Sequence, residues 1–363
     1  MTQHQPKSAK RLMASATFLL GLTLSACSLA QGATSAAPVP WSAPPSVSVV
    51  EEEKTFENGR SKLSGTLYLA RGRKPQSAIV VTHAAASPLR EFPLYQHLKD
   101  MLPALGIAVF IYDRRGSGKS GGDLQTSDYA LLADDAIAAV RMLKADPRID
   151  PRRVGIWGLS QGGWLSLLAA SRSSEPAFII SVSAPLVSPD VQMMFRSTNA
   201  LRVNGYPQAD IEQMIATRKA VDDYMRGSGD RATAQRLVDA ANTKPWFKFL
   251  YMGETVADRA TSRWRKEIEF DPLRTLDGVK VPALVIYGAL DPVVPVAISV
   301  ERLQASHPKL DVVVVAGADH SMQTSVPPQV QMDPARTREQ APEAVEYFAI
   351  LASWLTRQAM TSY

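Results

Sequence analysis

The pattern Gly158-x-Ser160-x-Gly162, which lies between two apolar segments, restricts the fold more than any other feature of the sequence. The run that ends at Leu159 has the character of a buried strand, and the alanine-rich segment after Gly163 is typical of a helix. A strand that turns directly into a helix strains the backbone of the serine between them, so glycine is required on either side. In this context the pattern indicates a nucleophile elbow, with the Ser160 hydroxyl lifted over a helix N-terminus. The alternative is a Gly/Ser-rich turn without chemistry.

Apolar runs and helical spacing alternate along the rest of the chain. The first two strands flank Asn58-Gly59, a strong hairpin signal, and most of the later ones have continuous apolar centres suited to a sheet buried on both faces. Strands are predicted at 47–56, 62–70, 77–82, 107–112, 177–183, 282–287 and 310–315, helices at 92–105, 129–144, 296–306 and 341–358, and a polar turn at 146–153. This rhythm predicts an α/β fold, with a mostly parallel central sheet, an N-terminal antiparallel hairpin and helices on both faces.

Residues 187–270 break the rhythm, because they are helical in character and contain no convincing buried strand. We therefore expect a helical lid inserted into a core formed by residues 49–186 and 271–363. The insertion is rich in large apolar side chains, which either form an apolar wall for a substrate or simply pack the lid onto the core. They are Met193, Met194, Phe195, Trp246, Phe247, Phe249, Tyr251, Met252 and Trp264.

The N-terminal 27 residues have the pattern of a signal peptide. Lys7, Lys10 and Arg11 precede an apolar run from Leu12 to Leu24, which is too short to span a membrane as a helix. The sequence Leu-Ser-Ala-Cys that ends at Cys27 resembles the lipobox of bacterial lipoproteins, and Cys27 is the only cysteine of the chain. We expect Cys27 to be lipidated and to hold the protein on a membrane of the bacterial envelope. The alternative is ordinary cleavage after Ala30 and a periplasmic or secreted protein.

Residues 28–48 are rich in Ala, Ser and Pro and predict an extended linker between the anchor and the folded part. The 363 residues carry a net charge of +5, and loss of the three basic residues of the signal segment leaves +2. The basic residues do not cluster in the sequence, so no nucleic-acid partner is indicated.

The glycine-rich segment from Asp113 to Gly122 contains Gly-x-Gly-Lys-Ser and superficially resembles a phosphate-binding loop. The Walker pattern requires a glycine five residues before Gly118, where this chain has Asp113, and a helix directly after the lysine and serine. Here Gly121 and Gly122 interrupt any immediate helix, so phosphate binding is not expected.

A serine needs a base within hydrogen-bond reach, and the base needs a carboxylate that orients it. Asp291 and His320 follow the last two predicted strands, at the sheet edge where the strand before Ser160 also ends. The alternative interpretation of Asp291, which precedes a proline, is that it only caps a turn. The alternative interpretation of His320 is a surface-loop histidine without a catalytic role. Asp319 is a rival acid, but it is adjacent to His320 in sequence and cannot easily reach its Nδ1 atom. No His/Asp/Glu cluster has metal-ligand spacing, so no metal is implied, and a serine that acts with a histidine and an aspartate requires no cofactor.

From about residue 60 to 358 the chain resembles an α/β-hydrolase of the bacterial esterase, acyl-transferase and prolyl-oligopeptidase-like group. Five segments carry the resemblance in the expected order: His83-Ala84-Ala85, 113–120, 158–162, 288–292 and 317–320. The resemblance implies Ser160 as nucleophile, His320 as general base and then acid, and Asp291 as the residue that orients His320. It also implies an oxyanion hole formed by the backbone N–H of Gln161 and a second N–H near His83.

By position Ala85 is that second donor, with Ala84 as the alternative, because this chain has Ala84 where the family usually has glycine. The expected activity is hydrolysis of a small-molecule carboxylic ester through an acyl-enzyme. An acyl-CoA thioesterase, an acyltransferase or a peptidase would use the same residues. An alternative of another class is a lipid-anchored envelope protein without turnover.

Overall fold

The computed structural model describes residues 47–72, 75–324, 326–333 and 341–360. The predicted signal segment, Cys27 and nearly all of the predicted linker lie outside these described residues and stay predictions. Among the helices of the described part, none is long and apolar enough to cross a membrane.

An eight-stranded sheet organises the described chain, in the order β1-β2-β4-β3-β5-β6-β7-β8. β1 pairs antiparallel with β2 and β2 antiparallel with β4, and every later pairing is parallel. This confirms the predicted sheet with its N-terminal antiparallel pair. The strands are β1 (Val49–Asn58), β2 (Ser61–Ala70), β3 (Gln76–Thr82), β4 (Ile107–Tyr112), β5 (Ile149–Leu159), β6 (Ile179–Val182), β7 (Ala283–Gly288) and β8 (Asp311–Val315).

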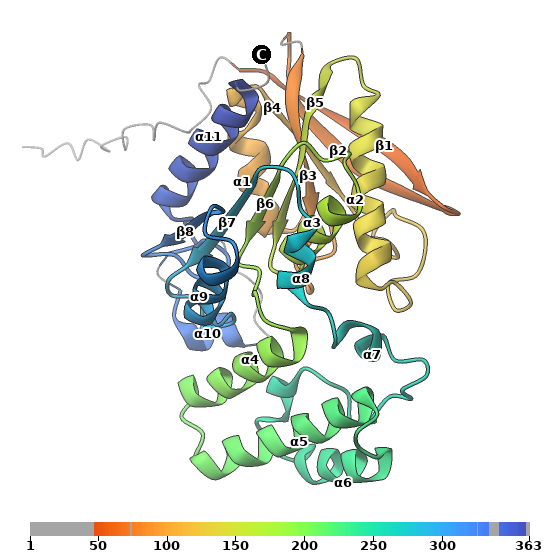
Figure 1. Cartoon of the computed structure of the whole chain (residues 1–363), viewed down its shortest axis with the longest axis vertical. Helices are drawn as coiled ribbons and strands as arrows, with labels where there is room; N and C mark the ends of the chain where they lie inside the picture. Colours follow the sequence, from red (N-terminus) through yellow and green to blue (C-terminus); the bar gives the residue numbers. More distant parts are fainter. Residues whose placement is uncertain (1–46, 73–74, 325, 334–340, 361–363) are drawn as a thin grey trace, which may run out of the picture. The chain divides into compact units, whose positions relative to one another are not determined.

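Successive side chains of the central strands enter two different hydrophobic clusters, as the alternation of a strand requires. In β3, Ala78 and Val80 belong to one cluster, whereas Ile79 and Val81 belong to the other. Helices α2 (Tyr129–Lys144) and α3 (Gln161–Arg172) cover the first face, and α1 (Pro93–Met101) and α11 (Val345–Met360) cover the second (Figure 1). Both faces of the sheet are therefore buried, which explains why its strands are continuously apolar.

Between β6 and β7 the chain forms helices instead of strands. Part of this segment has its own small core, built from Val221, Met225, Ala234, Val238, Val256 and Ile268. The helices are α4 (Pro189–Val203), α5 (Gln208–Arg226), α6 (Arg231–Ala241), η2 (Phe247–Leu250), α7 (Arg263–Glu267) and α8 (Pro272–Asp277). The remaining ones are η1 (Pro103–Leu105), α9 (Val296–Ser306) and α10 (Pro328–Met332).

Two expected element boundaries are wrong. The polar turn predicted at 146–153 ends early, because β5 already begins at Ile149, which pairs with Gln76. The register shifts between Gln76 and Ala78, so the strand accommodates Pro151 and its polar neighbours at an irregularity. The closing helix begins at Val345 rather than near residue 341. Glu343, which precedes it, instead forms an isolated antiparallel β-bridge with Gln323.

An ion-pair cluster ties β1 to the segment before β5. One Nη2 atom of Arg148 donates to Asp146 at 2.7 Å and to Glu52 at 2.7 Å. The hydrogen bonds from Arg148 lower the pKa of Glu52 from 4.5 to about 2 and also lower the pKa of Asp146. Both carboxylates therefore stabilise the folded state while they are ionised.

We expect the Arg148→Gln variant to lose less stability on acidification than the wild type. A carboxyl group whose pKa is lower in the folded than in the unfolded protein stabilises the fold at pH values above its unfolded pKa, which is near 4.5 for Glu52. This contribution disappears as the pH falls toward the folded pKa of about 2. The variant lacks the contribution at every pH, so its free energy of unfolding should start lower and fall less steeply. Urea denaturation from about pH 5 to about pH 2 measures both slopes. Parallel slopes would contradict the role of Arg148.

Candidate active site

Ser160 lies between the last residue of β5 and the first residue of α3, with φ 57° and ψ −118°. This conformation is rare for a residue with a side chain and brings the neighbouring backbone very close. A Cβ atom on Gly158 would overlap the carbonyl of Gly162, and one on Gly162 would overlap the carbonyl of Thr82. The Thr82 hydroxyl also donates to the Gly162 carbonyl at 2.8 Å. The turn at Ser160 is thus packed against the end of β3, and both glycines are required.

Asp291 follows β7 and His320 follows β8, and the fold brings their side chains together. Oδ2 of Asp291 lies 2.8 Å from Nδ1 of His320. Oδ1 of Asp291 accepts the backbone N–H groups of Val293 at 2.7 Å and Val294 at 3.0 Å. The carboxylate is therefore held by its own turn while its second oxygen faces the imidazole. The capping role considered for Asp291 and its contact with His320 exist together, one on each oxygen.

Asp319, the rival acid, does not pair with the imidazole. Its Oδ1 atom accepts the backbone N–H groups of Ser321 and Gln323, each at 2.8 Å. Burial raises the pKa of this carboxyl, and the two backbone hydrogen bonds oppose that rise. Asp319 thus shapes the turn that presents His320.

The loop after β3 supplies Ala84 and Ala85, the two positions considered as backbone donors. The Ala84 N–H is already used, since it donates to the Tyr95 hydroxyl at 3.0 Å. That hydroxyl in turn donates to the Ser87 carbonyl at 2.8 Å. Within the described part of the chain, the Ala85 N–H has no protein acceptor, and Ala85 lines the same cavity as Ser160 and Gln161. Of the two, only Ala85 retains a donor that is free for a ligand.

Arg114 holds the carbonyl groups of this loop, a contact that sequence reasoning missed. Its Nη2 atom donates to the carbonyls of His83 at 2.6 Å and Ala84 at 3.2 Å, and its Nη1 atom donates to that of Ala85 at 3.3 Å. Arg114 is 2% exposed, and burial lowers its pKa. In the described structure no carboxylate forms an ion pair with it, so it is a buried cation held by neutral groups. Arg114 lies in the segment 113–120, which carries the family resemblance but does not by itself indicate this contact.

His83 is a buried, neutral side chain and not a second base. Burial, reinforced by the charge of Arg114, lowers the pKa of His83 to about 3. Its Nε2 atom lies 2.5 Å from the Tyr112 carbonyl, which accepts only, so Nε2 carries the proton. The imidazole therefore fixes the start of the loop to the end of β4.

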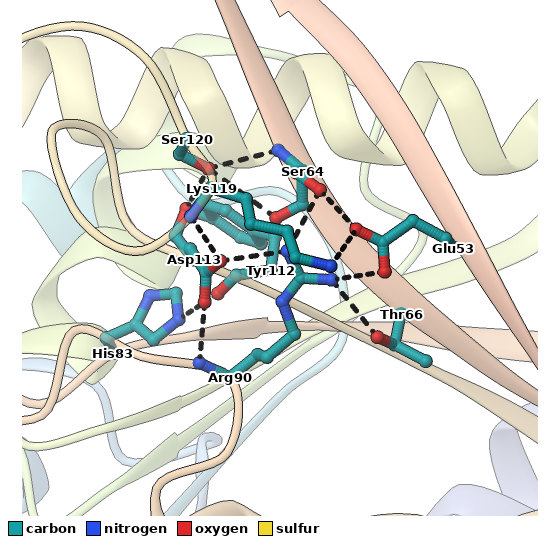
Figure 2. A network of polar contacts seen from close by, with 9 residues as sticks. All are labelled: Glu53, Ser64, Thr66, His83, Arg90, Tyr112, Asp113, Lys119 and Ser120. Atoms are coloured by element: carbon teal, nitrogen blue, oxygen red, sulfur yellow. Dashed lines mark hydrogen bonds and ion pairs between the residues drawn. The ribbon is translucent and has the colours of Figure 1, made fainter.

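A polar network anchors the far end of the same loop (Figure 2). Arg90 donates through its backbone N–H to Asp113 Oδ1 at 3.0 Å and through Nη2 to Asp113 Oδ2 at 2.8 Å. Nη1 of Arg90 also reaches Glu53 at 2.9 Å, and the Lys119 N–H donates to Asp113 at 2.9 Å. Asp113 and Arg114, both from the glycine-rich segment 113–122, thus hold the loop after β3 in place.

A cavity of about 690 Å³ opens over Ser160 and His320. Three of the large side chains of the helical segment line it, namely Met193, Tyr251 and Trp264, whereas Trp246 and Phe249 are buried in packing. Lining of the cavity and packing in the core therefore both occur, in different members of the set. Among the described residues, no group of three or more His, Cys, Asp and Glu side chains could hold a metal ion.

Two curated proteins resemble this chain over part of its length. The thiohydrolase aneE of Aspergillus aculeatus is 30% identical over 176 residues, which cover 47% of this chain and 52% of that protein. The thiohydrolase apmlB of Arthrinium phaeospermum is 34% identical over 122 residues, which cover 33% and 38% of the two chains. The chain thus spans about half or less of the length of these curated relatives.

A solved structure of the Pyrococcus furiosus esterase Pf2001 is similar with a TM-score of 0.54 at 18% identity, over 85% of this chain and 91% of that one. At this identity the likeness shows the fold alone. Residues 73–324 match the family described as serine aminopeptidase, S33. Since this match covers more than half of the chain, the protein belongs to the S33 serine aminopeptidase family of α/β-hydrolases.

Proposed function

We propose that this hydrolase cleaves carboxylic esters through an acyl-enzyme formed on Ser160. His320 takes the hydroxyl proton while Ser160 Oγ attacks the carbonyl carbon, and the same proton then passes to the departing alkoxide. Water, deprotonated by His320, attacks the acyl-enzyme, and the acid and free Ser160 are released. The observation that carries the proposal is the 2.8 Å contact between Asp291 and the His320 imidazole, beside a cavity that Ser160 shares.

The oxyanion of each tetrahedral intermediate would rest on the N–H groups of Gln161 and Ala85. In a trans peptide the C=O and N–H groups point to opposite sides, so an arginine that holds the Ala84 carbonyl turns the Ala85 N–H away from itself. Arg114 makes that contact at 3.2 Å, and Ala85 lines the cavity on which Ser160 opens. We therefore assign Arg114 as a positioning residue for the second donor.

Thioester hydrolysis is the second candidate, favoured by the two relatives named thiohydrolases. The same serine, histidine and aspartate would serve it, as they would serve an acyltransferase or a peptidase. A non-catalytic envelope protein has no need of the Asp291–His320 pair, and this makes it the weaker alternative. Anchoring through lipidated Cys27 remains a separate proposal. Mass spectrometry of the mature N-terminus tests it, and an unlipidated chain that begins at Gln31 would contradict it.

A fluorophosphonate probe together with matched acyl substrates tests the proposed activity. The wild type should be labelled once per chain, at Ser160, and should hydrolyse a 4-nitrophenyl ester faster than the corresponding anilide. An acyl thioester of the same chain length, measured beside them, separates the first candidate from the second. A wild-type protein that is neither labelled nor active on any of the three would contradict a serine hydrolase.

We expect Arg114→Met to lower kcat about 100- to 1,000-fold, which is the usual cost of losing one oxyanion donor, with little change in KM. The methionine fills much of the space but leaves the Ala84 and Ala85 carbonyls without their donor. Steady-state kinetics measures the split. Affinity for a trifluoromethyl ketone, which binds serine enzymes as an oxyanion, should fall in parallel with kcat.

Arg115→Met is the matched control, because the neighbouring arginine donates to Asp135 at 2.9 Å and not to the loop. This variant should lower the melting temperature without lowering the kcat of the folded enzyme. If Arg114→Met behaves in the same way as the control, Arg114 is structural and the assignment is wrong.

A further inference from the structure

Helix α4 presents one face to the cavity, through Pro189, Gln192, Met193 and Arg196. Their spacing of three and four residues places them on the same side of the helix. Arg196 is the one arginine or lysine among the described residues that line this cavity. Of the side chains that the structure describes, Arg196 therefore supplies the one cationic group that faces the space on which Ser160 opens.

The guanidinium of Arg196 lies over an aromatic ring. Its Cζ atom lies 3.8 Å from the centre of the Tyr251 ring, a close cation–π contact. The Tyr251 hydroxyl donates to the Met332 carbonyl at 2.9 Å, which fixes the ring. A guanidinium that contacts an aromatic ring keeps N–H groups that can donate to a planar anion. Arg196 is thus held in place by Tyr251 before any ligand arrives.

Arg196 has no carboxylate partner among the described residues, whereas three other arginines of the helical segment do. Arg218 pairs with Asp222 at 3.0 Å, Arg226 with Asp190 at 2.7 Å, and Arg263 with Glu267 at 2.6 Å. Arg196 is half-buried, and its Nε atom is buried without a hydrogen-bond partner. A cation that is partly desolvated and lacks a carboxylate partner favours the binding of an anion.

The cavity also limits the charge of that anion. Glu267, Asp319 and Asp333 line the same space, so a doubly charged group such as a phosphate monoester would meet three acidic neighbours and one cation among the residues described around it. A singly charged, planar group suits one guanidinium better, and a carboxylate is the group that a guanidinium binds in two parallel hydrogen bonds.

We infer that Arg196 binds a carboxylate carried by the substrate, remote from the bond that is cleaved. This inference rests on the proposed serine hydrolase function and specifies its substrate class as esters or thioesters that bear a free carboxylate. The carboxylate belongs either to the acyl part, as in the half-ester of a dicarboxylic acid, or to the leaving alcohol. Arg196 would bind the carboxylate in the same way in both cases, and experiments with matched substrates distinguish the two positions.

Two pairs of substrates test the inference on the full-length protein. For the acyl part, the mono-4-nitrophenyl ester of pimelic acid is compared with its terminal carboxamide. For the leaving group, 4-acetoxybenzoate is compared with 4-acetoxybenzamide. A hydrogen bond between two charged groups gives about 1.5–3 kcal/mol, so in one of the pairs the carboxylate should be preferred about 10- to 100-fold in kcat/KM.

Arg196→Met should abolish that preference, mainly through KM, and Arg196→Lys should restore part of it. Arg202→Met is the matched control, since Arg202 is exposed on the same helix and does not line the cavity. Melting temperatures identify any variant that fails to fold, and Arg196→Gln then replaces Arg196→Met. Turnover of both carboxamides without a carboxylate preference, or a preference that survives in Arg196→Met, overturns the inference and leaves the hydrolase intact. Absence of all turnover and of fluorophosphonate labelling overturns the proposed function itself and this inference with it.

Discussion

We expect Ser160→Ala to lower kcat by about 10⁵-fold or more, as loss of the nucleophile does in other serine enzymes. Alanine has no oxygen to attack the substrate, so neither the acyl-enzyme nor a covalent adduct with a fluorophosphonate can form. Alanine has the same Cβ as serine, so the backbone at φ 57° should be preserved and the melting temperature should change little. Burst kinetics with a 4-nitrophenyl ester and probe labelling measure the two expected losses.

Ser171→Ala is the control for this experiment, because Ser171 lies on the same helix α3 and its hydroxyl donates locally to the Leu168 carbonyl at 2.9 Å. The control should be labelled and active like the wild type. Strong labelling of Ser160→Ala would mean that another residue is the nucleophile.

We expect Asp291→Asn to lower kcat by about 10⁴-fold, which is the effect of the same change in a serine protease. The backbone N–H groups of Val293 and Val294 hold one side-chain oxygen, so the asparagine oxygen should stay there and its NH₂ group should face His320. Nδ1 of the imidazole must then accept, which leaves the proton on Nε2. In that tautomer His320 cannot take the proton of Ser160. Steady-state kinetics and the pH–rate profile measure the loss.

Asp319→Asn is the matched comparison, because Asp319 is adjacent to His320 but contacts backbone N–H groups instead of the imidazole. The asparagine oxygen can accept the same two hydrogen bonds, so we expect a smaller effect on kcat than that of Asp291→Asn. If Asp319→Asn is the more damaging change, the orienting carboxylate has been assigned to the wrong residue.

Local signals made the sheet predictable from sequence. The apolar runs of β3 and β4 and the Asn58-Gly59 turn follow from burial on two faces and from hairpin chemistry, and both depend on residues close together in the chain. The approach of Asp291 to His320 was expected for a related reason. Residues that follow neighbouring parallel strands meet at one edge of the sheet.

The side chains that hold the loop after β3 belong to segments distant in sequence, so local sequence signals do not predict their contacts. Nothing in the sequence indicates that Arg114 binds the carbonyls of Ala84 and Ala85, because nearly 30 residues and a helix separate them. The position of Arg196 over Tyr251 likewise depends on how two helical segments pack. The start of β5 was missed because Pro151 and the charged residues around it favour a turn, whereas pairing of Ile149 with Gln76 extends the strand.

The backbone of Ser160 has a consequence for selection under heat. A residue with a side chain in this conformation costs on the order of 1–3 kcal/mol, and glycine would adopt it without that cost. The most heat-resistant form of this chain is therefore expected to be an inactive one, with glycine at position 160. Laboratory evolution that screens for thermal survival alone would tend to discard the hydroxyl group, and only a simultaneous screen for turnover would retain it.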